Sequence, residues 1–222
     1  MLGGLAFLCA CGGAEDEPAT ARFRQEAVVT LGGEPLRAVT VGRIELARDR
    51  VHAVTTFPEA GPGQSARAAT ILVGDTTYLE FPPGDLPPGK RWLRAAAGDG
   101  VAAYGFSSEL ERDPRDVVAR LRVRGARPAR VGRATVDGVE TTRYRVRLPG
   151  REVEVWEGAA GLARRIVTIT HDGGVTTRAV TTFFGFGDDV EVEPPREALV
   201  VDAADADVGG GHPPVEVETG GE

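Results

Sequence analysis

The sequence has little of the chemistry on which most enzymes depend. Its 222 residues include three serines, three histidines, two cysteines, a single lysine and no asparagine. Two cysteines exclude a disulfide-rich scaffold, and the lack of any apolar run of 18 residues excludes a membrane-spanning helix. No serine lies in the Gly-x-Ser-x-Gly sequence of a nucleophile elbow. We therefore predict a protein that is not an enzyme and has no catalytic residues.

Candidate metal ligands are equally scarce. The histidines His52, His171 and His212 are too far apart in the sequence for metal-ligand spacing. A cation site could be made of Asp202, Asp205, Asp207 and His212, but these residues lack the rest of a calcium-binding loop and are more typical of a solvated tail. We expect no metal site and no cofactor.

Acidic residues gather at the two ends of the chain. The formal net charge is −7, but segments 11–21 and 203–222 contain eight acidic residues and neither lysine nor arginine. The body between them is almost neutral, although arginines cluster at 120–133 and 143–151. Because nucleic-acid binding needs a concentrated basic face, we expect no nucleic-acid partner. Residues 203–222, which are rich in glycine, proline and acid, are predicted to be disordered.

The first eleven residues resemble the end of a bacterial lipoprotein signal. Leu8-Cys9-Ala10-Cys11 has the lipobox pattern of an apolar residue, two small residues and a cysteine. We predict residues 1–10 as a truncated signal peptide and 11–21 as an acidic tether, anchored by acyl chains such as palmitate on Cys11. The protein would then be extracytoplasmic, on the outer face of the cytoplasmic membrane. The alternative is an ordinary N-terminus with buried cysteines.

Most of the stretch from 22 to 187 has the period of β-strands. Residues 143–148 alternate three arginines with three apolar residues, which gives one dry face and one wet face. Asp137-Gly138 can take the positive φ angles of a tight hairpin between two such runs. Gly74-Asp75 and residues 171–174 divide other pairs of runs in the same way. Sequential hairpins of this kind predict an antiparallel sheet.

One short amphipathic helix interrupts the predicted strands. Asp113 suits the N-cap, Pro114 the first helical position and Gly125 the stop. Its apolar face consists of Val117, Val118 and Leu121.

A weaker second helix is predicted over 95–110, and the proline-rich stretch 81–90 is predicted to be an extended loop. Together the patterns predict an α+β fold, in which a curved antiparallel sheet of about ten strands, a half-barrel, covers a few short helices. A sheet of that length must twist and curl, which leaves a concave apolar face.

Several stretches, in their order and spacing, resemble one protein family. They are 131–144, Val153-Glu154-Val155-Trp156, Leu162-Ala163-Arg164-Arg165, the ending from Phe186 to Pro195, and an earlier landmark from Tyr78 to Trp92. With the lipobox, they make residues 22–202 similar to the LppX/LprAFG family of actinobacterial lipoproteins, which is related in shape to the LolA and LolB carriers. The resemblance implies a LolA-like half-barrel with an apolar cavity. It also implies that a lipid or lipoglycan is bound or carried in the cell envelope.

Two features depart from the family pattern. Only Pro149-Gly150-Arg151 separates two strands that in many relatives enclose a helical segment, which predicts a smaller or less covered cavity. The acidic C-terminal tail has no counterpart in the family.

Apolar residues of the predicted strands and helix are the candidates for the cavity lining. They are Leu46, Phe57, Ile71, Leu79, Phe81, Trp92, Leu121, Tyr144, Val146, Val153, Val155 and Ile166. Small residues on several strands favour open space, namely Ala27, Ala38, Ala53, Ala68 and Ala179. Ordinary core packing requires the same inward-facing side chains, so the sequence leaves both interpretations open.

The function that we predict is that of an envelope lipoprotein, held at the membrane by Cys11, that carries a lipid without catalysis. The alternative is an RseB/MucB-like sensor that binds a protein through Arg143, Arg145 and Arg147 or through the 82–88 loop. A structural lipoprotein with a filled core is the third possibility. The sequence identifies no protein partner.

Overall fold

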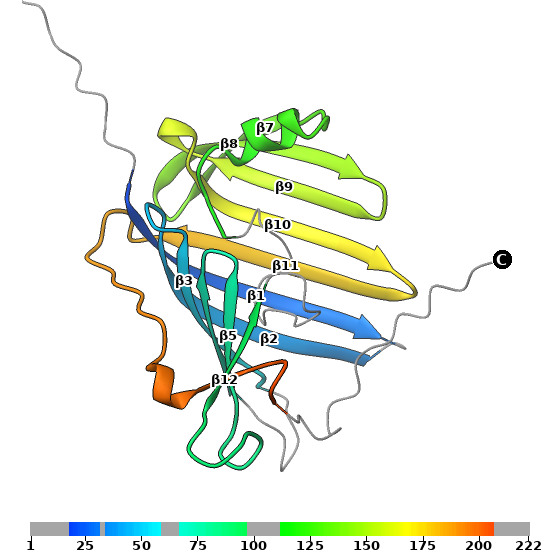
Figure 1. Ribbon diagram of the computed structural model, residues 1–222. Helices are drawn as coiled ribbons and strands as arrows, with labels where there is room; N and C mark the ends of the chain where they lie inside the picture. Colours follow the sequence, from blue (N-terminus) through cyan, green and yellow to red (C-terminus); the bar gives the residue numbers. More distant parts are fainter. Residues whose placement is uncertain (1–17, 32–33, 59–66, 97–111, 207–222) are drawn as a thin grey trace, which may run out of the picture.

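The computed structural model describes residues 18–31, 34–58, 67–96 and 112–206, which form one long, curved sheet (Figure 1). Its strand order is β12-β6-β5-β4-β3-β2-β1-β11-β10-β9-β8-β7. The strands are β1 (Thr20–Leu31), β2 (Glu34–Glu45), β3 (Arg50–Thr56), β4 (Arg67–Val73), β5 (Thr76–Glu80), β6 (Trp92–Ala96), β7 (Ala129–Val136), β8 (Val139–Leu148), β9 (Arg151–Glu157), β10 (Ala163–Asp172), β11 (Val175–Phe184) and β12 (Val200–Asp202). The pairing of β1 with β11 joins the two halves of the sheet.

Neighbouring strands are antiparallel from β6 to β7, as the hairpin signals predict. Asp137 and Gly138 have φ angles of 48° and 81° and form the turn between β7 and β8. Gly74-Asp75 connects β4 to β5, and Gly173-Gly174 connects β10 to β11. The tight connection at Pro149-Gly150 between β8 and β9 is also confirmed.

The short strand β12 is the exception, because it pairs in parallel with β6. The chain reaches it through residues 185–199, drawn in orange in Figure 1. Val192 in this segment is fully buried, its N–H donates to the Glu45 carboxylate, and its carbonyl accepts a hydrogen bond of 3.2 Å from Arg50. Arg94 Nε then donates to Asp202 Oδ1 at 2.5 Å and holds β12 against β6.

The helix α1 (Val117–Val123) begins three residues later than predicted. Its N-cap is Asp116, and Asp113 instead accepts a hydrogen bond of 2.9 Å from the Arg115 backbone N–H. Pro114 lies in extended chain, because its carbonyl accepts a hydrogen bond of 2.8 Å from Ala163 N and Arg115 forms a β-bridge with Leu162. The predicted apolar face is confirmed, since Val117, Val118 and Leu121 are buried. Gly125 follows the helix with a φ of 82°.

Three other expectations differ from the structure. The described residues contain twelve strands rather than about ten, and they contain one α-helix and two short 3₁₀ turns, η2 (Ala159–Gly161) and η3 (Glu197–Leu199), rather than a few helices. The second helix was predicted from Ala95, but Ala95 and Ala96 end strand β6, and residues 97–110 lie outside the described residues. The predicted signal peptide, most of the tether and the tail beyond 206 also lie outside them.

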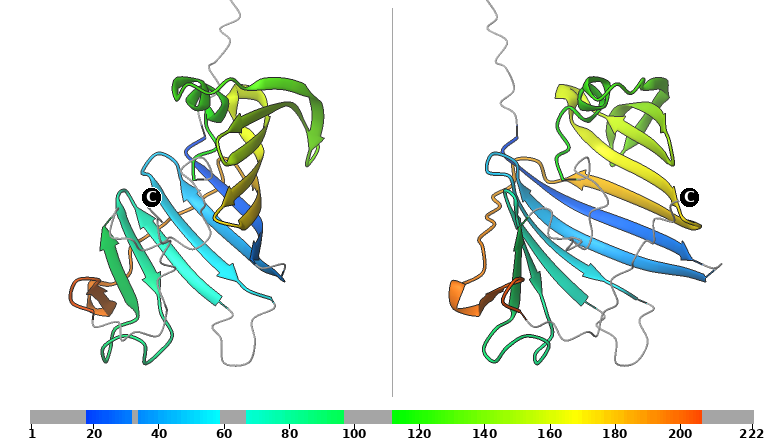
Figure 2. Two further views of the ribbon diagram at one scale, coloured as in Figure 1. Left: turned by 90° about the vertical axis from the view of Figure 1, so that its right-hand side faces the viewer. Right: turned by 45° about the vertical axis from the view of Figure 1, so that its right-hand side comes forward.

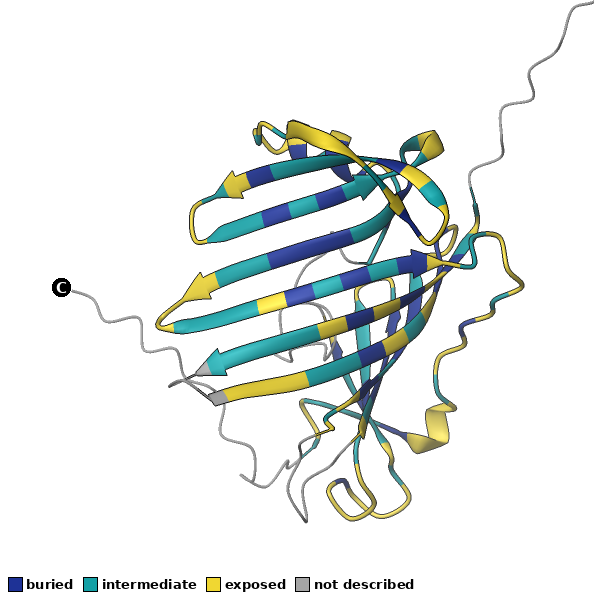
Figure 3. Ribbon diagram, turned by 180° about the vertical axis from the view of Figure 1, so that it is seen from behind, coloured by how far each residue is buried: buried dark blue, intermediate teal, exposed yellow. Residues whose placement is uncertain are grey.

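The core lies on the concave face of the sheet, under α1. One cluster of buried residues joins Val51 of β3 and Leu72 of β4 to Val146 of β8 and Val153 of β9. Because these strands are far apart in the sheet order, the sheet must curl toward this face, as Figure 2 shows. Figure 3 shows the resulting alternation of buried and exposed residues along the central strands.

Candidate ligand-binding site

Small side chains lie side by side on the concave face of the central strands. Ala27 of β1 pairs with Ala38 of β2 on one side and with Ala179 of β11 on the other. The register places Ala53 of β3 and Ala68 of β4 on the same face, with Ala68 beside Thr55 and Ala53 deeper in the core cluster. The five alanines that the sequence suggested for open space therefore face the same side of the sheet, but Ala53 belongs to the closed core, Ala179 is also buried, and only Ala27, Ala38 and Ala68 are half-buried.

A row of polar side chains borders the alanines toward the core. Gln25 Nε2 donates a hydrogen bond of 3.0 Å to Thr181 Oγ1, and the hydroxyls of Thr40 and Thr55 lie 2.8 Å apart. All four residues are buried. Since buried polar groups are costly unless they are hydrogen-bonded, these bonds hold the four side chains, one on each of the four central strands, in place. The sequence pattern did not reveal this row.

Beyond the alanines the concave face becomes accessible. Val29 is half-buried and pairs with Leu36, whose side chain is 49% exposed. The face therefore changes from a closed apolar core below α1 to an apolar, partly exposed margin near the hairpin of β1 and β2.

Eight of the twelve predicted lining residues lie on this concave face or on the helix that covers it. Six belong to the core cluster: Leu46, Leu121, Val146, Val153, Val155 and Ile166. Tyr144 packs against that cluster and is half-buried, and Leu79 is buried on the same face of β5. The fold therefore brings these eight predicted residues together on the concave side of the sheet.

The other four predicted residues are dispersed. Ile71 and Trp92 point to the opposite face, because their neighbours Leu72 and Leu93 occupy the concave one. Phe57 follows the end of β3 and is half-buried. Phe81 follows the end of β5 and lines a separate pocket.

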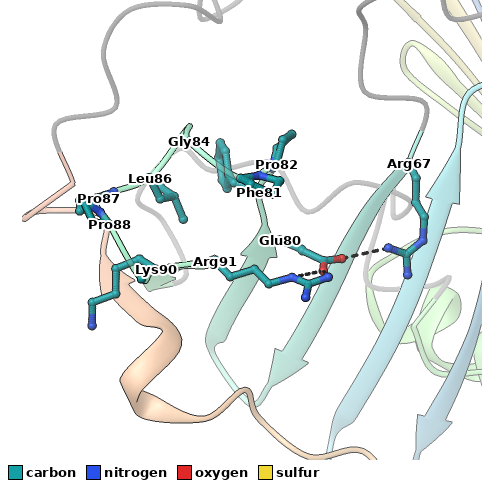
Figure 4. A pocket seen from close by; sticks show the side chains of 12 residues that line it. Arg67, Glu80, Phe81, Pro82, Gly84, Leu86, Pro87, Pro88, Lys90 and Arg91 are labelled. Carbon is teal, nitrogen blue, oxygen red and sulfur yellow. Dashed lines mark hydrogen bonds and ion pairs between the residues drawn. The ribbon is translucent and has the colours of Figure 1, made fainter.

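That pocket lies within the proline-rich loop between β5 and β6 (Figure 4) and has a volume of about 830 Å³. Phe81, Leu86 and four prolines supply apolar walls, and Leu86 is buried. On one side, Glu80 accepts hydrogen bonds from Arg67 at 3.2 Å and from Arg91 Nε at 2.6 Å. The pocket thus combines an apolar wall with arginines that are already paired.

A second pocket, of about 480 Å³, lies on the outer face of β8 to β11 and was not predicted. Arg143 and Arg145 both donate hydrogen bonds to Glu154, and the Arg143 guanidinium lies 5.0 Å from the centre of the Trp156 ring. Burial alone would raise the pKa of Glu154, but the hydrogen bonds and charges of the two arginines outweigh it and hold this pKa below its usual value. Only the pairing of the strands, which the sequence does not give, brings these groups together.

No helix among the described residues is long and apolar enough to cross a bilayer. Within the same residues, no three histidine, cysteine, aspartate or glutamate side chains come together as metal ligands.

Comparison with known proteins identifies the architecture. No family model and no curated protein sequence matches the chain. Among solved structures, the lipoprotein LppX of Mycobacterium tuberculosis superposes with a TM-score of 0.50, over 79% of this chain and 90% of LppX, at 12% identity. The chain has the fold of LppX. The resemblance predicted from the sequence is therefore supported at the level of the fold.

Two further structures align less closely than LppX. LprF of Mycobacterium bovis has a TM-score of 0.42 at 15% identity, over 80% of this chain and 90% of LprF. MucB has a TM-score of 0.38 at 15% identity, over 84% of this chain and 58% of MucB. The fold assignment stands on LppX alone.

Proposed function

We propose that this protein is an extracytoplasmic lipoprotein of the LppX/LprAFG type that binds a lipid or lipoglycan without catalysis. Lipidated Cys11 would hold it at the membrane, and the concave face would shelter an acyl chain of the ligand. The LppX fold and the lipobox-like sequence Leu8-Cys9-Ala10-Cys11 support the family and the anchor. The surface of the concave face supports the ligand class.

The row of Ala27, Ala38 and Ala179 is the observation that carries the proposal. Methyl side chains on three adjacent strands take little space above the concave sheet, and Ala27 and Ala38 are only half-buried, although Ala179 is buried. A surface of this kind suits a narrow apolar ligand. Val29 and Leu36 continue the row to the accessible margin, which would be the entrance. Each buried methylene contributes about 0.8 kcal/mol. A sixteen-carbon chain would therefore gain about 12 kcal/mol before the costs of ordering, so no specific polar contact is required.

Filling the alanine row tests the proposal. Ala27→Phe places a large ring on the concave face, whereas Val28→Phe places the same ring on the opposite face of the same strand; both positions are half-buried. We expect Ala27→Phe to weaken uptake of a fluorescent fatty acid at least tenfold and Val28→Phe to leave it unchanged. Circular dichroism would confirm that both variants are folded. Equal uptake by the two variants would contradict binding at this row.

A protein-sensing function of the RseB/MucB kind is the second candidate. The pocket in the proline-rich loop favours it, because exposed prolines and an apolar wall suit a peptide segment. The outer-face arginines favour it less, since Arg143 and Arg145 are already held by Glu154. The uptake assay separates the candidates, because a domain that senses only proteins would leave the fatty acid unbound in the wild-type protein.

A further inference from the structure

A basic surface with exposed apolar side chains lies at the α1 end of the molecule. It consists of Arg122 and Val123 of α1, Arg127 of the loop that follows, and Arg130, Val131 and Arg133 of β7. We call it the basic end surface. All six residues are exposed; Val123 is 89% exposed and Val131 45%. The segment 120–133 contains no acidic residue.

The two elements meet at Tyr144. The Arg122 guanidinium lies 5.9 Å from the centre of the Tyr144 ring, and Arg130 is the strand partner of Tyr144. Arg133 pairs with Thr142 on the same side of β8. The arginines of α1 and β7 thus form one surface rather than two separate patches.

Most of these charges are uncompensated by the protein. In the described part of the chain, no ion pair joins Arg127, Arg130 or Arg133 to a carboxylate. Arg122 acts on Glu157: burial raises the pKa of Glu157, and the positive charge of Arg122 offsets part of that rise. By contrast, Arg143 and Arg145 on the outer face share the carboxylate of Glu154. The positive charge of the basic end surface is therefore available to attract an anionic partner.

The N-terminal tether enters the fold at this same end. Ala19 O accepts a hydrogen bond of 2.7 Å from Leu46 N, and Leu46 O accepts one of 3.2 Å from Arg115, two residues before α1. Figures 1 and 2 show the start of β1 and the green helix at one end of the molecule. Pro18 lies seven positions after Cys11, and because an extended chain covers about 3.5 Å per residue, the two can be at most about 25 Å apart. A lipid on Cys11 would thus hold this end near the bilayer.

We infer that the basic end surface docks on the anionic headgroups of the membrane in which the protein is anchored. Arginines next to a bilayer attract anionic lipid, and exposed valines among them can enter the interface. Nucleic acid or an acidic protein would also be attracted to the arginines. Either would bury the exposed valines less well than the interface of a bilayer does. The inference rests on the proposed function only for the anchor at Cys11, and it adds a second membrane contact that orients the concave face.

Vesicle binding by the full chain carrying Cys11→Ser tests the inference without the anchor. We expect the protein to co-sediment with phosphatidylcholine vesicles that contain 30% phosphatidylglycerol, to bind pure phosphatidylcholine weakly, and to be released by 0.5 M salt. Because each arginine near an anionic surface contributes about fivefold in binding, the triple variant R127Q/R130Q/R133Q should bind on the order of 100-fold more weakly. Val123→Ser should also lose binding.

The matched control removes three arginines elsewhere. R37Q/R147Q/R178Q has the same net charge as the test variant, but its changes lie on β2, β8 and β11 at the opposite end of the strands, and it should bind the vesicles like the parent protein. Equal loss in both variants, equal binding to neutral vesicles, or binding only to nucleic acid or an acidic protein would overturn the inference. Fatty-acid uptake should be unchanged in R127Q/R130Q/R133Q, so a failure of lipid carriage and a failure of docking are distinguishable.

Discussion

Gly42 of β2 lies so close to its neighbours that a single added methyl group should lower the stability of the fold strongly. A Cβ added to Gly42 would lie 2.3 Å from Phe23 Cε1 and 2.6 Å from the His52 carbonyl oxygen. The carbonyl belongs to the neighbouring strand β3 and cannot move without breaking the sheet. The Phe23 ring is fully buried and packs against Phe183 with ring centres 6.5 Å apart. Neither the Phe23 ring nor the His52 carbonyl can move away from the added methyl group without a cost in free energy.

Overpacking of this kind costs about 1–3 kcal/mol, and we expect Gly42→Ala to lie near the upper limit. For a domain of this size, about 3 kcal/mol lowers the melting temperature by roughly 6–12 °C. Urea unfolding and thermal melts followed by circular dichroism would measure it. Gly158→Ala is the control, because its added Cβ would meet atoms no closer than 3.6 Å; it should change the free energy of unfolding by less than about 0.5 kcal/mol.

A second substitution tests whether the Phe23 ring causes the loss of stability in Gly42→Ala. Phe23→Leu removes the ring, so the cost of Gly42→Ala should be smaller in the Phe23→Leu protein than in the wild type. The reasoning would be refuted if Gly42→Ala were as stable as Gly158→Ala, or if the effects of Phe23→Leu and Gly42→Ala were additive.

Two further substitutions have effects of opposite sign. Arg143 and Arg145 hold the pKa of Glu154 below its usual value, so ionised Glu154 stabilises the fold at neutral pH and this contribution is lost as the pH falls through the lowered pKa. Glu154→Gln should therefore unfold at lower urea than the wild type at pH 7, and the gap should close below about pH 4; a gap independent of pH would contradict the assignment. Ala160 is exposed and has a left-handed conformation, with φ 52° and ψ 28°. Ala160→Gly should raise stability by up to about 1 kcal/mol, whereas Ala159→Gly, in the same turn, should not; equal effects in thermal melts would count against backbone strain.

The sequence predicted the hairpins well because their signals are local. Asp137-Gly138 adopts the positive φ angles that a tight turn requires. The alternation of arginine and apolar residues in β8 fixed which side chains face inward, and Val146 is buried in the core as expected. The start of α1 was wrong because it depends on residues far along the chain. Ala163 and Leu162 hold Pro114 and Arg115 in an extended conformation, and no signal near Asp113 reveals them.

The residues of the candidate site could be predicted only in part, because local sequence patterns do not always show which face of a strand a side chain occupies. Residues 68–73 of β4 are almost wholly apolar, and both faces of the strand are buried: Ile71 on one side and Leu72 on the other. Periodicity therefore could not show that Ile71 points away from the concave face. Trp92 and Leu93 present the same ambiguity at the start of β6. The hydrogen-bonded row that includes Gln25 and Thr181 depends on the pairing of β1 with β11, which joins opposite ends of the chain.

Mass spectrometry of the protein purified from host membranes tests the central claim most directly. Organic solvent would separate a lipid bound non-covalently on the concave face from acyl chains attached to Cys11, which stay with the protein. The account predicts about one extractable lipid per wild-type molecule, a marked loss of it in Ala27→Phe, and its retention in Val28→Phe. Wild-type protein that yields no extractable lipid and takes up no fatty acid would contradict the claim.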